Sequence, residues 1–390
     1  MRDAVIVDAV RTAVGKGKPG GALSGIHPTD LSAHVLKALA ERNSLDPATV
    51  DDVIWGCVSQ VGEQAGGIGR YSVLAAGWPE HVPGLTVDRQ CGSSQQAVHQ
   101  AAAGVIAGQY DIAIAGGVES MSRVPMGSPR MGGRLGEPFG TLVAERYDNY
   151  RFNQGVGAEM IAEEFGLTRE DLDQHALDSH ARAARAMAEG RFKSQITPVT
   201  VTDTDGSTRV FDTDEGIRRG GTLDAMAGLK TPFRTDGVVS AGNASQISDG
   251  SAALLVTTSD IAERNGWTPI ARFHTGVVTG VDPVTMLKGP IPATRKALER
   301  SGLGIDDIGA FEINEAFAAV SLGWQRQTGA DYERMNPNGG AIALGHPLGG
   351  SGARLMTTLV HHMRDNGIRY GLQSMCEGGG MANATILEII

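Results

Sequence analysis

The fold is decided by two similar stretches of the chain, HVLKALAERNSLDPATVDDVIWG at residues 34–56 and PATRKALERSGLGIDDIGAFEIN at residues 292–314. Each has the pattern of an amphipathic helix, a turn with paired aspartates and an apolar strand. Each is followed by a Gly/Ser-rich turn that opens a helix, and then by a strand that ends in glycines, AIAGG or MCEGGG. This repeat predicts two similar α/β halves stacked face to face. The alternative, a chance likeness between two helix–strand units, stays open from the pattern alone.

Short apolar runs alternate with helical stretches elsewhere in the chain, as is typical of α/β proteins. Residues 121–249 break the rhythm, because a Gly/Pro/Met/Arg-rich stretch is followed there by a long polar helix. We therefore predict a subdomain inserted into the first half. The expected strands are 4–10, 51–59, 111–120, 251–259, 309–317 and 384–390, and the expected helices include 29–42, 94–107, 291–301 and 351–365.

The bulk properties of the 390 residues are those of an ordinary soluble enzyme, large enough for two or three compact units. A net charge of −10 argues against a nucleic-acid surface and against docking on anionic lipid. No signal peptide and no apolar run as long as a membrane span is present. Three cysteines, Cys57, Cys91 and Cys376, do not suggest a disulfide framework. We expect free thiols in the reducing cytoplasm.

Cys91 stands in TVDRQCGSSQQA, where an apolar run turns into an Ala/Gln-rich helix. A thiol at the start of a helix faces unpaired backbone N–H groups and the positive end of the helix dipole. Both favour the thiolate and can bind an oxyanion. Gly92 is expected to leave room for the backbone to approach a substrate. Taken alone, however, a cysteine at such a turn is more often a small buried residue.

Three further glycine-bordered turns offer partners for this thiol. Asn314 and Glu315 follow an apolar strand in INEAFAAV, and His346 lies in NPNGGAIALGHPLGGSGA. Cys376 precedes three glycines in SMCEGGGMA. Each residue separately fits a turn or a satisfied core group. Together, two thiols, an imidazole and an amide indicate a cysteine/histidine site for nucleophilic catalysis.

The chain resembles the thiolase family along essentially its whole length, because QCGSS, NEAFA, GGAIALGHPLG and CEGGG occur in the family's order and separation. The resemblance implies an α/β thiolase fold, in which two βαβαβαββ half-domains form a five-layered αβαβα arrangement. It places the N-terminal half at residues 1–120 and 250–268, an inserted loop domain that binds coenzyme A at 121–249, and the C-terminal half at 269–390. A homodimer or a homotetramer is also implied.

The resemblance implies roles for five residues. Cys91 would take the acyl group as a thioester, and His346 would accept the thiol proton, for which an imidazole is suited. Cys376 would move the proton on the α-carbon of the acetyl unit. His346 and a water held by Asn314 would supply one oxyanion site, and the backbone N–H groups of Cys91 and Gly378 a second.

Coenzyme A is implied as a co-substrate, with no permanently bound cofactor and no metal. The segment RRGGTLDAMAGLKTPFRTDGVVSAGNASQISDG, residues 218–250, resembles the family's coenzyme A segment. A purely structural connection is the alternative for this Gly/Ala/Ser-rich loop. Arg218 lies where a basic residue contacts the nucleotide end of the cofactor. The other implied contacts are Leu229, Phe233, Ala241, Ser245, Ala316 and Phe317.

The implied activity is thiolytic cleavage of a 3-ketoacyl-CoA to acetyl-CoA and a shortened acyl-CoA, reversible as a Claisen condensation, in β-oxidation of fatty acids or related lipid degradation. Biosynthetic members often have His-Met where the loop RFNQGVGAEM has Asn153 and Gln154. This departure favours the degradative type with a longer or bulkier acyl group over a biosynthetic acetoacetyl-CoA thiolase, which remains the alternative. Ser94 replaces a usual glycine and is expected to narrow or re-aim the turn at Cys91.

Two other enzyme classes are weaker alternatives. A decarboxylating ketoacyl synthase typically pairs its cysteine with two histidines, or with a histidine and an asparagine, whereas Cys376 suits proton abstraction. A nicotinamide-dependent oxidoreductase needs Gly-x-Gly-x-x-Gly directly between the first strand and a helix. Here the first turn, RTAVGKGKPGG, continues into GALSGIHPTD instead. The cysteines and histidines also show no metal-ligand spacing.

Overall fold

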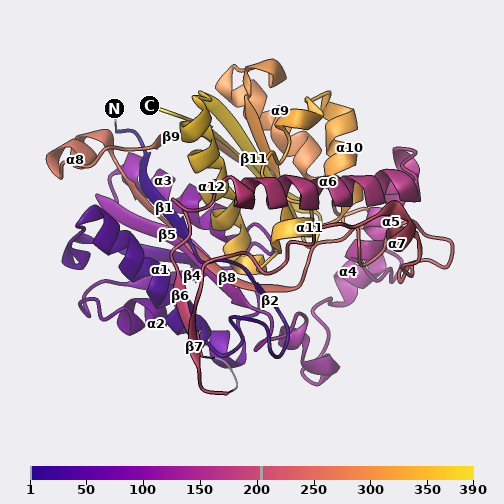
Figure 1. Ribbon diagram of the computed structural model, residues 1–390, viewed down its shortest axis with the longest axis horizontal. Coiled ribbons are helices and arrows are strands. Elements are labelled where there is room, and N and C mark those ends of the chain that lie inside the picture. Colours follow the sequence, from indigo (N-terminus) through magenta and orange to yellow (C-terminus); the bar gives the residue numbers. More distant parts are fainter. Residues whose placement is uncertain (1, 203–204) are drawn as a thin grey trace.

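The computed structural model describes residues 2–202 and 205–390. Its centre is a sheet with the strand order β10-β11-β12-β9-β1-β8-β5-β3-β4, in which β2 also pairs with β8 (Figure 1). The strands of the sheet are β1 (Val5–Arg11), β2 (Gly15–Lys16), β3 (Asp52–Gly56), β4 (Gly84–Val87), β5 (Ile112–Ser120), β8 (Ser248–Thr257), β9 (Ala271–Gly280), β10 (Ala310–Ile313), β11 (Tyr370–Glu377) and β12 (Met381–Glu388).

The repeat in the sequence is also a repeat in the sheet. In the first half, β3 and β5 are parallel, while β5–β8 and β8–β1 are antiparallel. In the second half, β10 and β11 are parallel, while β11–β12 and β12–β9 are antiparallel. The halves join where β1 runs antiparallel to β9, with Val5 opposite Arg272 and Ile6 opposite Ala271. Equivalent strands of the two halves therefore meet at this junction.

Helices cover and separate the two halves of the sheet. Helices α1 and α2 pack on strands of the first half, and α9 packs on strands of the second. Helices α3 and α12 contact each other, and α12 contacts strands of both halves, so these two form the central layer (Figure 1). The predicted thiolase fold, with helices on the outside and in the middle, is confirmed. The bounds are α1 (Pro28–Asn43), α2 (Ile68–Ala75), α3 (Ser93–Ala107), α8 (Ser259–Arg264), α9 (Pro290–Ser301), α10 (Ala318–Thr328), α11 (Ala341–Leu344) and α12 (Leu348–Asn366).

Small residues let the two central helices touch near their N-terminal ends. The Ser94 hydroxyl of α3 accepts a hydrogen bond from the backbone N–H of Ala353 in α12, at 2.9 Å. A Cβ on Gly352 would lie 2.3 Å from the backbone nitrogen of Gln95, so only glycine fits there. The expected effect of Ser94 on the turn at Cys91 stays a prediction, and the structure shows that its hydroxyl is engaged with α12.

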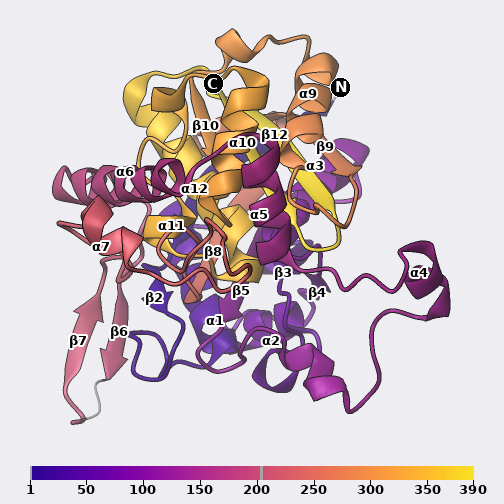
Figure 2. The ribbon, with the colours of Figure 1, turned by 90° about the vertical axis from the view of Figure 1, so that its right-hand side faces the viewer.

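The region between β5 and β8 carries α4 (Thr141–Arg146), α5 (Gln154–Glu164), α6 (Arg169–Ala188), α7 (Leu223–Ala227) and the hairpin of β6 (Val199–Thr202) and β7 (Thr208–Phe211). Helix α6 is the predicted long polar helix, and Thr168 with Asp171 forms a capping box at its start. Figure 2 shows α4 at the end of an arm that extends away from the body. The division of the chain into 1–120 with 250–268, 121–249 and 269–390 stays a prediction.

Several strands differ from the sequence-based expectation, and two of them matter for the site and for the junction of the halves. The strand expected at 309–317 ends at Ile313, and the following residues form the turn that leads into α10. Strand β9 was not among the expected strands. Its sequence, ARFHTGVVTG, is only partly buried and contains Arg272 and His274, so it lacks the continuous apolar run of the neighbouring strands.

Candidate active site

Cys91 lies just before the first turn of α3 and is 5% exposed. The preceding residue, Gln90, has a φ of 48°, which is uncommon for a residue with a side chain and bends the chain sharply at the thiol. Burial raises the pKa of the Cys91 thiol to about 12, and Glu377 adds to this increase. Hydrogen bonds from the backbone N–H groups of Cys91 and Gly378 act in the opposite direction. The sulfur therefore lies close enough to the N–H groups of Cys91 and Gly378, which were predicted to form an oxyanion site, for both to lower its pKa.

Gly92 is needed for a different reason from the one predicted. A Cβ at this position would lie 2.1 Å from Oε1 of Glu377 and 2.7 Å from Nδ2 of Asn383. The room beside Gly92 is therefore occupied by the protein's own side chains. Glu377 is fully buried, and neither of its carboxylate oxygens has a hydrogen-bond partner. Burial raises the pKa of Glu377 to about 8, Arg89 lowers it and Asp88 raises it further.

His346 is held in the turn between α11 and α12. Gly345 before it has a φ of 94°, which favours glycine, and the backbone N–H of His346 donates to the carbonyl oxygen of Gln246 at 3.1 Å. The Nδ1 atom lies 2.6 Å from the Ser351 hydroxyl, which itself donates to the Pro347 carbonyl oxygen. Nδ1 is therefore the protonated nitrogen, and Nε2 remains free to accept a proton.

Asn314 faces this acceptor nitrogen from the turn after β10. Its Nδ2 lies 3.4 Å from Nε2 of His346, and its Oδ1 is buried without a partner. Burial lowers the pKa of His346 to about 3, and Arg354 lowers it further. The imidazole is therefore neutral at neutral pH, with an acceptor nitrogen and an unpaired amide oxygen side by side. Such a pair suits a bound water or a substrate oxygen.

Cys376 is fully buried near the end of β11. Burial raises the pKa of its thiol well above the usual value, and the neighbouring Cys91 is the next largest cause. The two thiols are thus electrostatic neighbours, and both are free cysteines. Gly378 follows at the end of the strand, where it brings its N–H to the Cys91 sulfur. The structure therefore brings Cys91, Cys376 and Gly378 together, and separately joins Asn314 to His346.

A cavity of about 180 Å³ opens beside His346. Four of the seven residues predicted to hold coenzyme A line it, namely Phe233, Ser245, Ala316 and Phe317. The rings of Phe233 and Phe317 meet edge to face, with their centroids 6.0 Å apart. The other three predicted residues, Arg218, Leu229 and Ala241, are exposed and do not line the cavity.

Two family models match the chain, one after the other. The thiolase N-terminal domain matches residues 4–260, and the thiolase C-terminal domain matches residues 267–389. The chain belongs to the thiolase family. The predicted family is thereby confirmed, and with it an acyltransferase that acts on acyl-CoA.

Several curated thiolases are similar to the chain over its full length. It is 50% identical to the steroid 3-ketoacyl-CoA thiolase FadA6 of Mycobacterium tuberculosis, 94% of which is covered. It is 45% identical to the beta-ketoadipyl-CoA thiolase of Escherichia coli and 42% identical to the 3-ketoacyl-CoA thiolase of Bacillus subtilis, both fully covered. The predicted activity, thiolytic cleavage of 3-ketoacyl-CoA in degradation, is confirmed.

A solved thiolase structure is also similar. The acetyl-CoA acetyltransferase of Bacillus anthracis superposes with a TM-score of 0.91 at 38% identity, covering 100% of this chain and 99% of that one. No helix of the described part of this thiolase is long and apolar enough to cross a membrane. Within the same residues, no cluster of His, Cys, Asp and Glu side chains could hold a metal ion.

Sequence reasoning missed several cavity residues of this thiolase. Gln154 was singled out only as a departure from the family, and the stretch 121–140 only as a loop that packs on something. No periodicity marks these residues, because they come from separate loops that meet only in the folded chain. The additional lining residues are Met121, Met126, Ala244, Gln246, Ile247 and Leu348.

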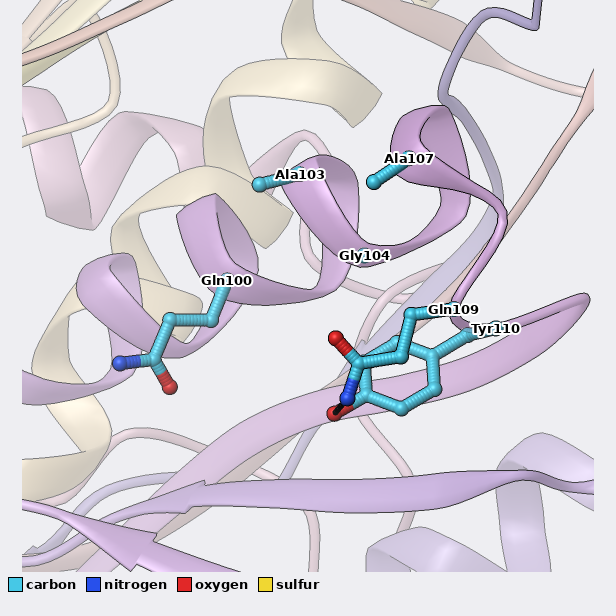
Figure 3. A pocket seen from close by; sticks show the side chains of 6 residues that line it. All are labelled: Gln100, Ala103, Gly104, Ala107, Gln109 and Tyr110. Atoms are coloured by element: carbon cyan, nitrogen blue, oxygen red, sulfur yellow. Dashed lines mark hydrogen bonds between the residues drawn. The ribbon is translucent and has the colours of Figure 1, made fainter.

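A larger hollow, of about 350 Å³, lies elsewhere on the thiolase. It is formed by the outer side of α3 and the residues after it, with Gln100 and Gly104 on the helix and Gln109 and Tyr110 beyond it (Figure 3). The Tyr110 hydroxyl donates to Asp52 at 3.0 Å. None of the predicted catalytic or coenzyme A residues lines this hollow, so it is separate from the acyl-transfer site.

Proposed function

We propose that Cys91, His346 and Cys376 carry out the thiolytic cleavage of 3-ketoacyl-CoA in this thiolase. The observation that carries the proposal is the position of the Cys91 sulfur. It lies against the N–H groups of Cys91 and Gly378 and beside the Cys376 thiol. A sulfur in this position can bond a carbonyl carbon while the two N–H groups hold the carbonyl oxygen.

The bond changes follow from these positions. The Cys91 sulfur attacks the 3-keto carbon and gives its proton to Nε2 of His346. The bond between C2 and C3 of the substrate then breaks, and the Cys376 thiol gives its proton to C2, which releases acetyl-CoA. Free coenzyme A gives its thiol proton to the Cys376 thiolate and attacks the thioester on Cys91. The bond between the Cys91 sulfur and the acyl carbon then breaks, His346 returns its proton to that sulfur, and the shortened acyl-CoA leaves. His346 and Asn314 stabilise the negative oxygen of the acetyl-CoA enolate through a bound water.

Buried neutral groups suit this sequence of steps. The raised pKa of Cys91 and the lowered pKa of His346 keep both uncharged in the free enzyme. A thiolate and an imidazolium then form only as the substrate supplies a carbonyl carbon and the N–H groups receive its oxygen. Such a site gives its strongest interactions to the transition state rather than to the free enzyme.

Coenzyme A is proposed as the co-substrate, with no permanently bound cofactor and no metal. Phe233, Ser245, Ala316 and Phe317 would hold its pantetheine arm at the cavity, and Leu229 and Ala241 the part outside. Arg218 is exposed, and its backbone N–H donates to His180 at 3.1 Å. Its guanidinium is therefore available for a phosphate of the nucleotide end.

The cellular setting is proposed as β-oxidation of fatty acids or related lipid degradation in the cytoplasm. A homotetramer is supported by two surfaces. Strand β4 ends the sheet, so one of its edges is open for pairing with a second copy. The arm that carries α4 exposes apolar side chains, with Leu135 and Leu142 each 82% exposed, which favours burial against another subunit.

The test is to trap the acyl-enzyme. The protein is incubated with acetoacetyl-CoA, and digestion with mass spectrometry locates the acetyl group. We expect the adduct on Cys91, and its loss when free coenzyme A is added. An adduct on Cys57 or Cys376 in place of Cys91 would refute the assignment. Turnover of 3-ketoacyl-CoAs of increasing length then separates the degradative type from the biosynthetic one, which would accept acetoacetyl-CoA alone.

A further inference from the structure

The cavity beside His346 is mostly apolar and contains few free polar groups. Four of its lining side chains are polar, namely Gln154, Ser245, Gln246 and His346. His346 belongs to the catalytic machinery. The Gln246 amide nitrogen already donates to the carbonyl oxygens of Gly216, Ile342 and Ala343. Ser245 is among the residues proposed to hold coenzyme A, which leaves Gln154.

The carboxamide of Gln154 makes no hydrogen bond to any residue that the structure describes, and its side chain is half-buried. Its backbone, by contrast, is fixed. Gln154 is the first residue of α5, and the Asn153 side chain caps the helix by accepting from the N–H groups of Gly155 and Val156. A Cβ on Gly155 would lie 2.2 Å from the Phe233 ring, so this ring packs directly on the helix start.

Most of the remaining wall offers no partner to a polar group on the acyl chain. Met121, Met126, Phe233 and Leu348 are apolar, and no ionised side chain lines the cavity. Arg123, two residues after Met121 in the chain, does not line the cavity and is engaged with Glu63 and with the carbonyl oxygen of Ser24. When an acyl chain displaces water from this wall, a plain alkyl chain leaves the carboxamide unpaired, which costs binding free energy.

We infer that Gln154 is a specificity-determining residue that binds an oxygen atom on the acyl chain, beyond the 3-keto group. The inference rests on the proposed function and narrows its substrate class. The preferred 3-ketoacyl-CoA carries a second oxygen function, either a neutral carbonyl or a carboxylate, in reach of the Gln154 amide. The N–H groups of the amide donate to this oxygen, and a chain without such an oxygen binds less well.

The experiment compares three substrates of equal chain length, 3-oxohexanoyl-CoA, 3-oxoadipyl-CoA and the methyl ester of 3-oxoadipyl-CoA. The unchanged enzyme and the variants Gln154→Leu and Met126→Leu are each assayed with all three substrates in the presence of coenzyme A. In the unchanged enzyme we expect kcat/KM to be about tenfold higher for at least one oxygenated substrate than for 3-oxohexanoyl-CoA, the ratio that one hydrogen bond provides. Comparison of kcat/KM for the acid and for its methyl ester shows whether the Gln154 amide binds a carboxylate or a neutral carbonyl.

The preference is expected to disappear in Gln154→Leu and to persist in Met126→Leu, which changes the same wall without changing its polar groups. A preference for 3-oxohexanoyl-CoA in the unchanged enzyme, or an unchanged ratio in Gln154→Leu, would overturn the inference. If the enzyme turns over none of the three substrates, the result instead contradicts the proposed function. Melting temperatures of both variants, measured with and without coenzyme A, verify that each remains folded.

Discussion

At the scale of single residues, the Cys91 thiol is subject to opposing influences. Burial and Glu377 favour the neutral thiol, whereas the N–H groups of Cys91 and Gly378 favour the thiolate. Burial is the larger influence, so the resting thiol is protonated. The helix start at Cys91 therefore does not produce a reactive thiolate in the free enzyme. Its N–H groups are positioned to hold an oxygen that becomes negative during the reaction.

Replacement of the nucleophile tests this arrangement directly. Cys91→Ala is expected to lower kcat by about four orders of magnitude or more, because it removes the nucleophile that forms the thioester. The melting temperature of the variant should change little, because the substitution removes only one sulfur atom. Steady-state turnover and thermal melting measure the two effects. Cys57→Ala is the matched control, because Cys57 is also a buried free cysteine, and it should retain activity.

The raised pKa values predict how Cys91 reacts with iodoacetamide. A thiol whose pKa is about 12 gains roughly tenfold in thiolate for each pH unit across pH 7–10, so alkylation should keep rising without a plateau. Glu377 ionises near pH 8, and its charge then opposes the thiolate. The rise should therefore be shallower in the region around pH 8, and Glu377→Gln should remove this shallow region. A plateau below pH 7 would mean that a thiolate–imidazolium pair exists at rest.

At the scale of elements, Glu119 joins the two halves at the start of α12. This buried residue near the end of β5 accepts hydrogen bonds from the N–H groups of Val58, Ser59 and Gly349 and from the Gln64 amide, at 2.8–3.0 Å. Gly349 lies in the first turn of α12, three residues after His346. The carboxylate thus fixes the helix that carries the base relative to the half that carries the nucleophile.

Glu119→Gln is expected to lower stability by about 2 kcal/mol and to lower kcat about tenfold, because an amide cannot accept four hydrogen bonds. KM should change little. Glu159→Gln is the comparison, since Glu159 is also buried and accepts from the N–H groups of Val238 and Val239. Glu159→Gln should lower the stability of the protein by a similar amount. It should also raise KM for coenzyme A, because Glu159 holds the segment that is proposed to bind the cofactor. Equal effects on kcat in both variants would contradict a positioning role for Glu119.

Much of this arrangement could be predicted from the sequence, and the rest depends on tertiary contacts. The four helices expected at 29–42, 94–107, 291–301 and 351–365 lie within a few residues of α1, α3, α9 and α12, because they have helical spacing and end signals, such as Gly108 after α3. Cys91, His346 and Cys376 were found through glycine-bordered turns. The burial of Glu377 could not be predicted, because an acidic residue before glycines has the pattern of an exposed turn. Gln154 reaches the cavity only through the packing of Phe233 on α5.

At the scale of the whole molecule, the arm with α4 is expected to hold subunits together. Leu142→Glu places a charge on an exposed apolar helix and should not unfold the subunit. It should convert a tetramer to dimers, because burial of a carboxylate at a subunit contact costs several kcal/mol. Light scattering after size-exclusion chromatography measures the mass. Thr141→Glu adds the same charge to the same helix at a position that is not apolar, and a smaller effect is expected.

The contact between the N-terminal ends of α3 and α12 also has a consequence for how this chain evolved. The two helices occupy equivalent places in the two halves, and one begins beside the nucleophile, the other beside the base. A duplicated ancestor would have presented two matching helix starts across one symmetry axis. New chemistry then required only that the copies diverge at those starts, while the shared backbone plan was inherited unchanged.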